Sequence, residues 1–171
     1  MNLKELLNEK REQILERWVD LIIQTYPSDA SNFLKNKQNR FDNPIGYSIS
    51  SSVGEIFRFL VDGLDPEAVA TPLDSIIKVR AVQEFTPAQA VNFVFLLKQA
   101  IRFDLADQIK EANLLEELLE FEYRFDNLIS LAFNIYCDCR EKLYKIRVDE
   151  LSRRTDILFA QLNKVKPPEG L

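Results

Sequence analysis

Apolar residues recur along most of this chain every three or four positions, which is the spacing of one face of an α-helix. No stretch shows the alternating pattern of a strand bounded by turn residues. The sequence therefore predicts an all-α fold. The expected apolar faces cover residues 3–22, 45–64, 73–82, 87–102 and about 114 onward, with a further short helix from Ala30 to Arg40 anchored by Phe33, Leu34 and Phe41.

Prolines that follow a cap-type residue mark where helices are expected to begin. Such pairs are Asn43-Pro44, Asp65-Pro66, Thr71-Pro72 and Thr86-Pro87. The cap side chain accepts a hydrogen bond from the first turn, where proline lacks an N–H that would be unbonded anyway. Gln89 completes a capping box with Thr86. Gly63 is expected to end the second helix, Pro27 to close the first, and Pro167-Pro168 to close the last.

Two of the predicted helices differ in how they are expected to pack. Residues 87–102 are apolar almost all round, which is typical of a helix at the centre of a bundle; their polar exceptions, Gln89, Asn92 and Gln99, form a narrow stripe. From about Leu114 no proline or glycine interrupts the chain before Pro167, and one apolar face continues to Ile146.

A weaker seam formed by Leu151, Leu158 and Leu162 follows that face, and a lone helix would leave it in water. These three leucines are therefore the candidate dimer interface of a homodimer. We expect a helical domain over residues 1–140 and a C-terminal helical extension and tail over residues 141–171.

Length and charge restrict the class of protein. The chain has 171 residues, of which 46% are hydrophobic. This length is typical of a single domain. Its net charge of −5 argues against a nucleic-acid partner. The start of the chain lacks the apolar segment of a signal peptide, and no apolar run is long enough to span a bilayer. We expect a cytoplasmic protein without membrane insertion.

The chain contains no histidine. This removes the usual general base near neutral pH, the commonest metal ligand and the usual proximal ligand of haem. Cys137 and Cys139 are two residues apart on a helix, so they point to different faces and neither a shared metal nor a disulfide is expected. The sequence predicts no catalytic, cofactor or metal site, and therefore no enzyme.

Charge is segregated along the C-terminal half. Residues 104–126 hold eight acidic and two basic residues, whereas residues 140–166 hold eight basic and four acidic residues. The favoured interpretation is that both charged segments simply face solvent. The alternative is that the acidic surface of one copy meets the basic helix of another copy within a dimer.

Arg80 and Gln83 are three residues apart in apolar surroundings, just before the capped turn into residues 87–102. Because arginine is costly to bury unpaired, two interpretations are open. In the favoured one, Arg80 holds the corner by bonding carbonyls or an acid. In the other, it binds an anionic or polar ligand.

The same region carries a family resemblance. The segments Asn43-Pro44-Ile45-Gly46, Arg80-Ala81-Val82-Gln83-Glu84-Phe85-Thr86-Pro87, Ala90-Val91-Asn92-Phe93-Val94-Phe95 and Leu97-Lys98 resemble the N-terminal domain of RsbR-type stressosome co-antagonists, in the RsbRD subfamily. Trp18 and Tyr26-Pro27 fit as well, and the resemblance covers roughly Ile14 to Phe133. Arg80, Gln83, Asn43 and Trp18 are therefore the candidate polar network or ligand site.

The resemblance implies a haem-free, globin-like helical fold that dimerises and acts as a sensory or regulatory module with a protein partner in a signalling complex. Full-length relatives continue through a linker helix into a STAS domain; this chain ends at Leu171, so we expect a stand-alone sensor with residues 143–162 in place of the linker. The alternative is a carrier or sensor of a small apolar ligand, a lipid or tetrapyrrole, in a buried pocket. A further version of it has Cys137 anchor a chromophore.

Overall fold

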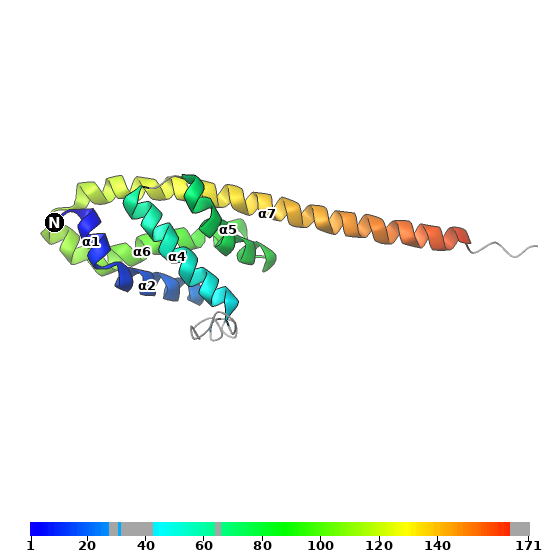
Figure 1. Cartoon of the computed structure of the whole chain (residues 1–171), viewed down its shortest axis with the longest axis horizontal. Coiled ribbons are helices and arrows are strands. Elements are labelled where there is room, and N and C mark those ends of the chain that lie inside the picture. The colour runs from blue at the N-terminus through cyan, green and yellow to red at the C-terminus, as the bar shows by residue number, and fades with distance from the viewer. Residues whose placement is uncertain (28–30, 32–42, 64–65, 165–171) are drawn as a thin grey trace, which may run out of the picture.

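The computed structural model describes residues 1–27, 31, 43–63 and 66–164. Its helices are α1 (Leu3–Glu9), α2 (Arg11–Gln24), α4 (Pro44–Asp62), α5 (Pro66–Val82), α6 (Pro87–Glu111) and α7 (Leu115–Lys164) (Figure 1). These described ranges contain no strand, so the predicted all-α class is confirmed. Of the helix expected from Ala30 to Arg40, all but Ser31 lies outside the described residues.

Helix α7 dominates the shape of the molecule. It is 50 residues long, or about 75 Å at the rise of an α-helix. The other helices gather against its N-terminal half, and its C-terminal half projects away from them (Figure 1). Leu143 is the last residue of α7 that packs against the core, and every side chain from Tyr144 to Asn163 is exposed. We call residues 144–163 the extension and the rest of the described chain the bundle.

The core lies inside a ring of helices: α6 packs on α2 and α7, α5 packs on α7 and α4, and α4 packs on α2. Ile14, Trp18, Phe93, Leu97 and Phe125 are among its fully buried side chains. Helix α6 is less completely buried than its composition predicts, because Phe95 and Phe103 are exposed on its outer face. A helix packed on two neighbours still leaves one side to solvent.

Several helix ends follow from local sequence. The Asn43 side chain accepts from the backbone N–H of Gly46 at 2.8 Å, and a Cβ on Gly46 would lie 2.4 Å from the Asn43 amide nitrogen, so this cap requires glycine there. Gly63 ends α4 in the left-handed region, at φ 71°. Thr86 and Gln89 form the predicted capping box of α6. These expectations are confirmed.

Three expectations about helix ends were wrong. Thr71-Pro72 does not begin a helix: α5 starts at Pro66 and Pro72 lies inside it, because burying the Pro72 ring with Leu73 offsets the backbone hydrogen bond that proline removes. Residues 3–22 form two helices, broken at Lys10, so that α1 packs separately against α4. Helix α5 ends at Val82, not near Phe85, and Val82 is exposed.

Candidate functional site

The corner between α5 and α6 has a tightly specified backbone. The N–H of Phe85 donates to the Arg80 carbonyl at 3.1 Å, and the N–H of Glu84 donates to the Ala81 carbonyl at 3.3 Å. Glu84 adopts φ 62°, in the left-handed region. This is a Schellman motif, and it ends α5 with Arg80 in its last turn and turned into the bundle.

Arg80 is fully buried and joins three elements. Its Nη1 donates to the Gln89 carbonyl at 2.7 Å, in the first turn of α6. Its Nη2 donates to the Thr25 hydroxyl at 2.9 Å, directly after α2. The guanidinium therefore ties the end of α5 to the start of α6 and the end of α2.

Aromatic rings surround this guanidinium. Its Cζ lies 5.3 Å from the ring centroid of Tyr26, 5.1 Å from that of Phe85 and 5.5 Å from that of Phe93. These distances allow attraction between the cation and the ring faces. Trp18 stacks on Phe93 with centroids 6.5 Å apart and donates its indole N–H to the Phe93 carbonyl at 2.6 Å. Trp18 and Arg80 therefore belong to one cluster, joined through Phe93.

The electrostatics of this cluster are unusual. No carboxylate among the described residues forms an ion pair with Arg80. Burial lowers the pKa of the Arg80 guanidinium and raises the pKa of the Tyr26 phenol, an effect that the nearby Arg80 charge partly opposes. Arg80 Nε and the Tyr26 hydroxyl are buried without a hydrogen-bond partner in the described part of the chain. The cluster thus holds a charge at a cost in desolvation.

The other two candidates have different roles: Asn43 caps a helix and Gln83 faces solvent. Asn43 is buried at the start of α4, where it caps that helix. Gln83 is exposed, whereas Arg80 is fully buried. Because α5 ends at Val82, the helical face expected to join Arg80 and Gln83 stops before Gln83. The structure therefore brings Arg80 and Trp18 together, whereas Asn43 caps α4 and Gln83 faces solvent.

Helix α7 holds the same corner from outside, through residues that the sequence analysis did not single out. The Tyr136 hydroxyl donates to the Phe85 carbonyl at 2.6 Å, and Arg140 Nη1 donates to the Ala81 carbonyl at 3.1 Å. Arg147 pairs with Glu84 at 3.1 Å. Spacings of four and seven place all three side chains on one face of α7. That spacing was visible in the sequence, but the carbonyls that they meet were not.

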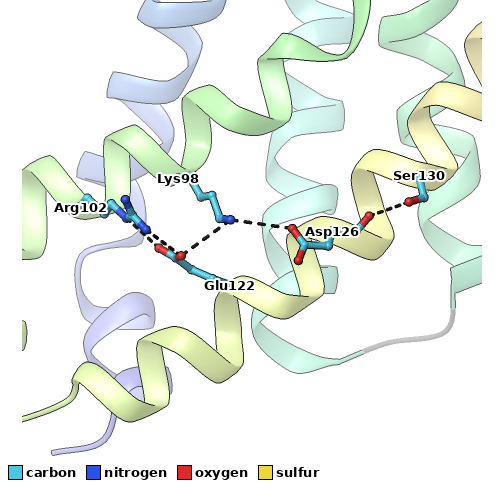
Figure 2. Close-up of polar contacts among 5 residues, drawn as sticks. All are labelled: Lys98, Arg102, Glu122, Asp126 and Ser130. Atoms are coloured by element: carbon cyan, nitrogen blue, oxygen red, sulfur yellow. Dashed lines mark hydrogen bonds and ion pairs between the residues drawn. The ribbon is translucent and has the colours of Figure 1, made fainter. Parts of the chain in front are cut away.

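A second polar network ties α6 to α7, and Figure 2 shows its members. Arg102 makes two hydrogen bonds of 2.7 Å to the nearly buried Glu122 carboxylate, which raises the pKa of Arg102. Lys98 lies 3.7 Å from Glu122 and 3.9 Å from Asp126, so it bridges two turns of α7. The Ser130 hydroxyl donates to the Asp126 carbonyl at 2.9 Å within α7 (Figure 2).

Beside this network an apolar groove of about 400 Å³ lies between the end of α6 and the start of α7. Its apolar lining consists of Ala106, Ile109, Leu115, Leu118 and Leu119; Arg102, Lys110, Asn113 and Glu122 complete it. Within the described ranges, no group of three histidine, cysteine, aspartate or glutamate side chains is placed to hold a metal ion. Cys137 and Cys139 are free thiols. The groove is lined mainly by apolar side chains, with charged and polar groups at its border.

Comparison with known proteins decides the family. The model of the "RsbT co-antagonist protein rsbRD N-terminal domain" family matches residues 12–151. The chain belongs to this family. An uncharacterized protein of Archaeoglobus fulgidus is 24% identical over 151 residues, which cover 82% of this chain and 83% of that protein. No solved structure matches the chain significantly.

The residues matched by the rsbRD family model include most of the features described above. They contain the whole Arg80 corner and the α6–α7 network, and they end at Leu151, inside the extension. Leu158 and Leu162 lie beyond them. None of the described helices is long and apolar enough to cross a membrane.

Proposed function

We propose that this rsbRD-type domain is a non-enzymatic sensory and regulatory module that acts by forming a homodimer and contacting a partner protein in a cytoplasmic signalling complex. One observation carries the proposal. The extension exposes a row of large apolar side chains that the bundle does not cover. These side chains are Tyr144, Val148, Leu151, Leu158 and Leu162. Isolated helices are marginal in water, so an extension of this kind favours a partner.

The spacing of that row supports pairing with another helix. We call these five residues the extension stripe. Steps of four and three residues separate Tyr144, Val148 and Leu151, and Leu158 and Leu162 continue the same face. Residues 1–140 then form the sensory domain, and residues 141–171 form the segment through which two copies meet.

The Arg80 corner supports a route from the bundle to the extension. Arg80 holds the corner from inside, and Tyr136, Arg140 and Arg147 hold it from α7. A change in the packing of the bundle at this corner would therefore be transmitted to α7 at the point where the extension begins.

Light scattering of the full chain tests the dimer. We expect the full chain to be a dimer and a chain that ends after Lys142 to be a monomer. Leu158→Glu should also give a monomer, whereas the matched control Ile157→Glu should remain a dimer. Leu158 and Ile157 are exposed to nearly the same extent, 59% and 57%, but adjacent helical positions point about 100° apart. A full chain that is monomeric at high concentration would exclude this proposal.

A second candidate function is that of a carrier or sensor of a lipid or tetrapyrrole. The apolar groove between α6 and α7 favours it, since a cleft with that lining would accept an apolar ligand. Native mass spectrometry of the purified protein tests this candidate through any added mass. We expect no haem, because the chain has no histidine; a stoichiometric Soret absorption band would contradict that expectation.

A further inference from the structure

Arg80 is fully buried, yet no opposite charge lies against it among the described residues. The nearly buried Glu122 carboxylate shows the usual arrangement, because it pairs with Arg102. Glu84, four residues after Arg80 in the chain, is exposed and pairs with Arg147 instead. A buried charge without a counter-ion is costly, so the Arg80 corner is suited to a negative charge from outside the chain.

Two hydrogen-bond donors of the corner are left over after the corner is built. Nη1 and Nη2 of Arg80 donate to the Gln89 carbonyl and the Thr25 hydroxyl. Arg80 Nε and the Tyr26 hydroxyl are buried and have no hydrogen-bond partner in the part of the chain that the structure describes. The Tyr26 hydroxyl lies close enough to the guanidinium for each group to act on the pKa of the other. Because buried polar groups are nearly always hydrogen-bonded, two such neighbouring donors form a place for an acceptor.

The surroundings restrict the chemistry of that acceptor. The ring centroids of Tyr26, Phe85 and Phe93 lie 5.3, 5.1 and 5.5 Å from Arg80 Cζ, and these rings offer no further donors around the guanidinium. A phosphate or sulfate has several oxygen atoms to satisfy and would find too few donors here. Water would satisfy the donors but leave the guanidinium charge uncompensated. A small anion with a single charge meets both requirements.

The guanidinium lies near the surface of the bundle although it is buried. Thr25 is only half-buried and Gln89 is exposed, and both bond Arg80 directly. An ion that enters beside these two residues, between the end of α2 and the start of α6, would meet the guanidinium without crossing the core.

We propose that the Arg80 corner binds one small monovalent anion of the halide class, to which Arg80 Nε and the Tyr26 hydroxyl donate. The hydrogen bonds of Nη1 and Nη2 stay in place, so Arg80 holds the corner and the anion together. Tyr136 and Arg140 of α7 bond the same corner from outside, and the anion would stabilise it from inside. The proposal concerns the bundle alone, and its failure would leave the proposed dimer untouched.

Thermal unfolding in two salts tests the anion. The natural chain is unfolded in potassium chloride and in potassium gluconate at equal ionic strength, because gluconate is too large for the corner. A ligand that binds only the folded state raises the melting temperature, and we expect chloride to raise it by about 2–4 °C relative to gluconate at about 1 M salt. Arg58→Ala, which removes an exposed arginine, should keep the whole difference between the salts.

Variants of the two donors locate the site. Tyr26→Phe keeps the ring and removes the hydroxyl, whereas Arg80→Lys keeps the charge and removes Nε. Both should lose most of the difference between the salts, and Tyr26→Phe decides by itself if Arg80→Lys does not fold. The chlorine NMR line should broaden with the natural chain and with Tyr123→Phe, a change at an exposed position, but much less with Tyr26→Phe.

Two outcomes would overturn the proposal. Equal melting temperatures of the natural chain in chloride and gluconate would show that the corner binds no halide. A chloride effect of unchanged size in Tyr26→Phe would show that the anion acts elsewhere on the protein.

Discussion

The two halves of α7 carry apolar residues at the same helical spacing but have very different surroundings. In the N-terminal half the bundle covers that face, and Phe125, Leu128 and Ala132 are almost completely buried. In the extension every described side chain is exposed. A helical apolar pattern therefore indicates a surface that needs a partner, and it does not say whether the partner is in the same chain.

Polar contacts show the same contrast. In the N-terminal half of α7, Glu122 pairs with α6, Arg124 donates to the Leu60 carbonyl of α4, and Tyr136 and Arg140 reach the α5–α6 corner. In the extension, Arg147 reaches Glu84, but the contacts beyond it stay within one turn of the helix, such as the pair between Arg154 and Glu150. The extension thus has a surface prepared for contact but little that holds it in place.

The largest expected effect comes from removing a buried ring on the bundle side of α7. Phe125→Ala should lower the free energy of unfolding by about 3–5 kcal/mol, because it removes a large apolar side chain and leaves a cavity. Leu158→Ala should change it by less than about 0.5 kcal/mol at a protein concentration where the dimer is dissociated. Urea unfolding of both variants measures the difference. Equal effects would mean that the extension packs against its own bundle.

Arg80→Ala should have the next largest effect, on the order of 1–3 kcal/mol or more, because the Gln89 carbonyl and Thr25 hydroxyl lose their donor. Arg80→Lys should restore only part of the loss, since lysine lacks the planar fork. The exposed Arg58→Ala is the matched control. Thermal or urea unfolding provides the measurement. An unchanged midpoint for Arg80→Ala would instead make Arg80 the leading ligand-site residue.

Glu122→Gln should cost about 1 kcal/mol, because it removes the carboxylate that Arg102 and Lys98 share between α6 and α7. The cost stays small because Arg102 itself is largely exposed, so solvent screens the pair. Glu120→Gln, an exposed change two residues away, is the control. Urea unfolding in low and high salt measures both variants, and the difference between them should shrink in high salt. A larger difference in high salt would argue against an electrostatic role.

Tyr26→Phe should have the smallest effect near neutral pH, a few tenths of a kcal/mol in either direction, because the lost hydroxyl has no partner among the described residues. The pKa of Tyr26 is raised above its usual value of 10.0, so the folded state holds the phenol proton more tightly than the unfolded state does. Its contribution is present below pH 10 and is lost as the pH rises beyond it. Urea unfolding at pH 8 and pH 11 should therefore show a smaller alkaline loss for Tyr26→Phe than for the natural chain. Tyr123→Phe, at an exposed position, should behave like the natural chain.

Local sequence determined the elements whose causes lie within a few residues. Asn43, Thr86 with Gln89, and Gly63 set helix ends through their own side chains or backbone freedom, and those ends are where the sequence predicts them. The long uninterrupted α7 was predictable for the same reason, because no proline or glycine stops it before Pro167.

Tertiary structure decided the features that depend on a distant surface. Pro72 stays inside α5, and the first helix breaks at Lys10, because apolar faces are buried better that way. The sequence singled out Arg80 but left its partners open; the fold selected the Gln89 carbonyl, the Thr25 hydroxyl and a cage of aromatic rings. It also placed Gln83 outside the cluster and brought Tyr136 and Arg140 to the corner. Hydrogen-bond partners far apart in sequence follow from how helices pack, and local spacing carries no information about that.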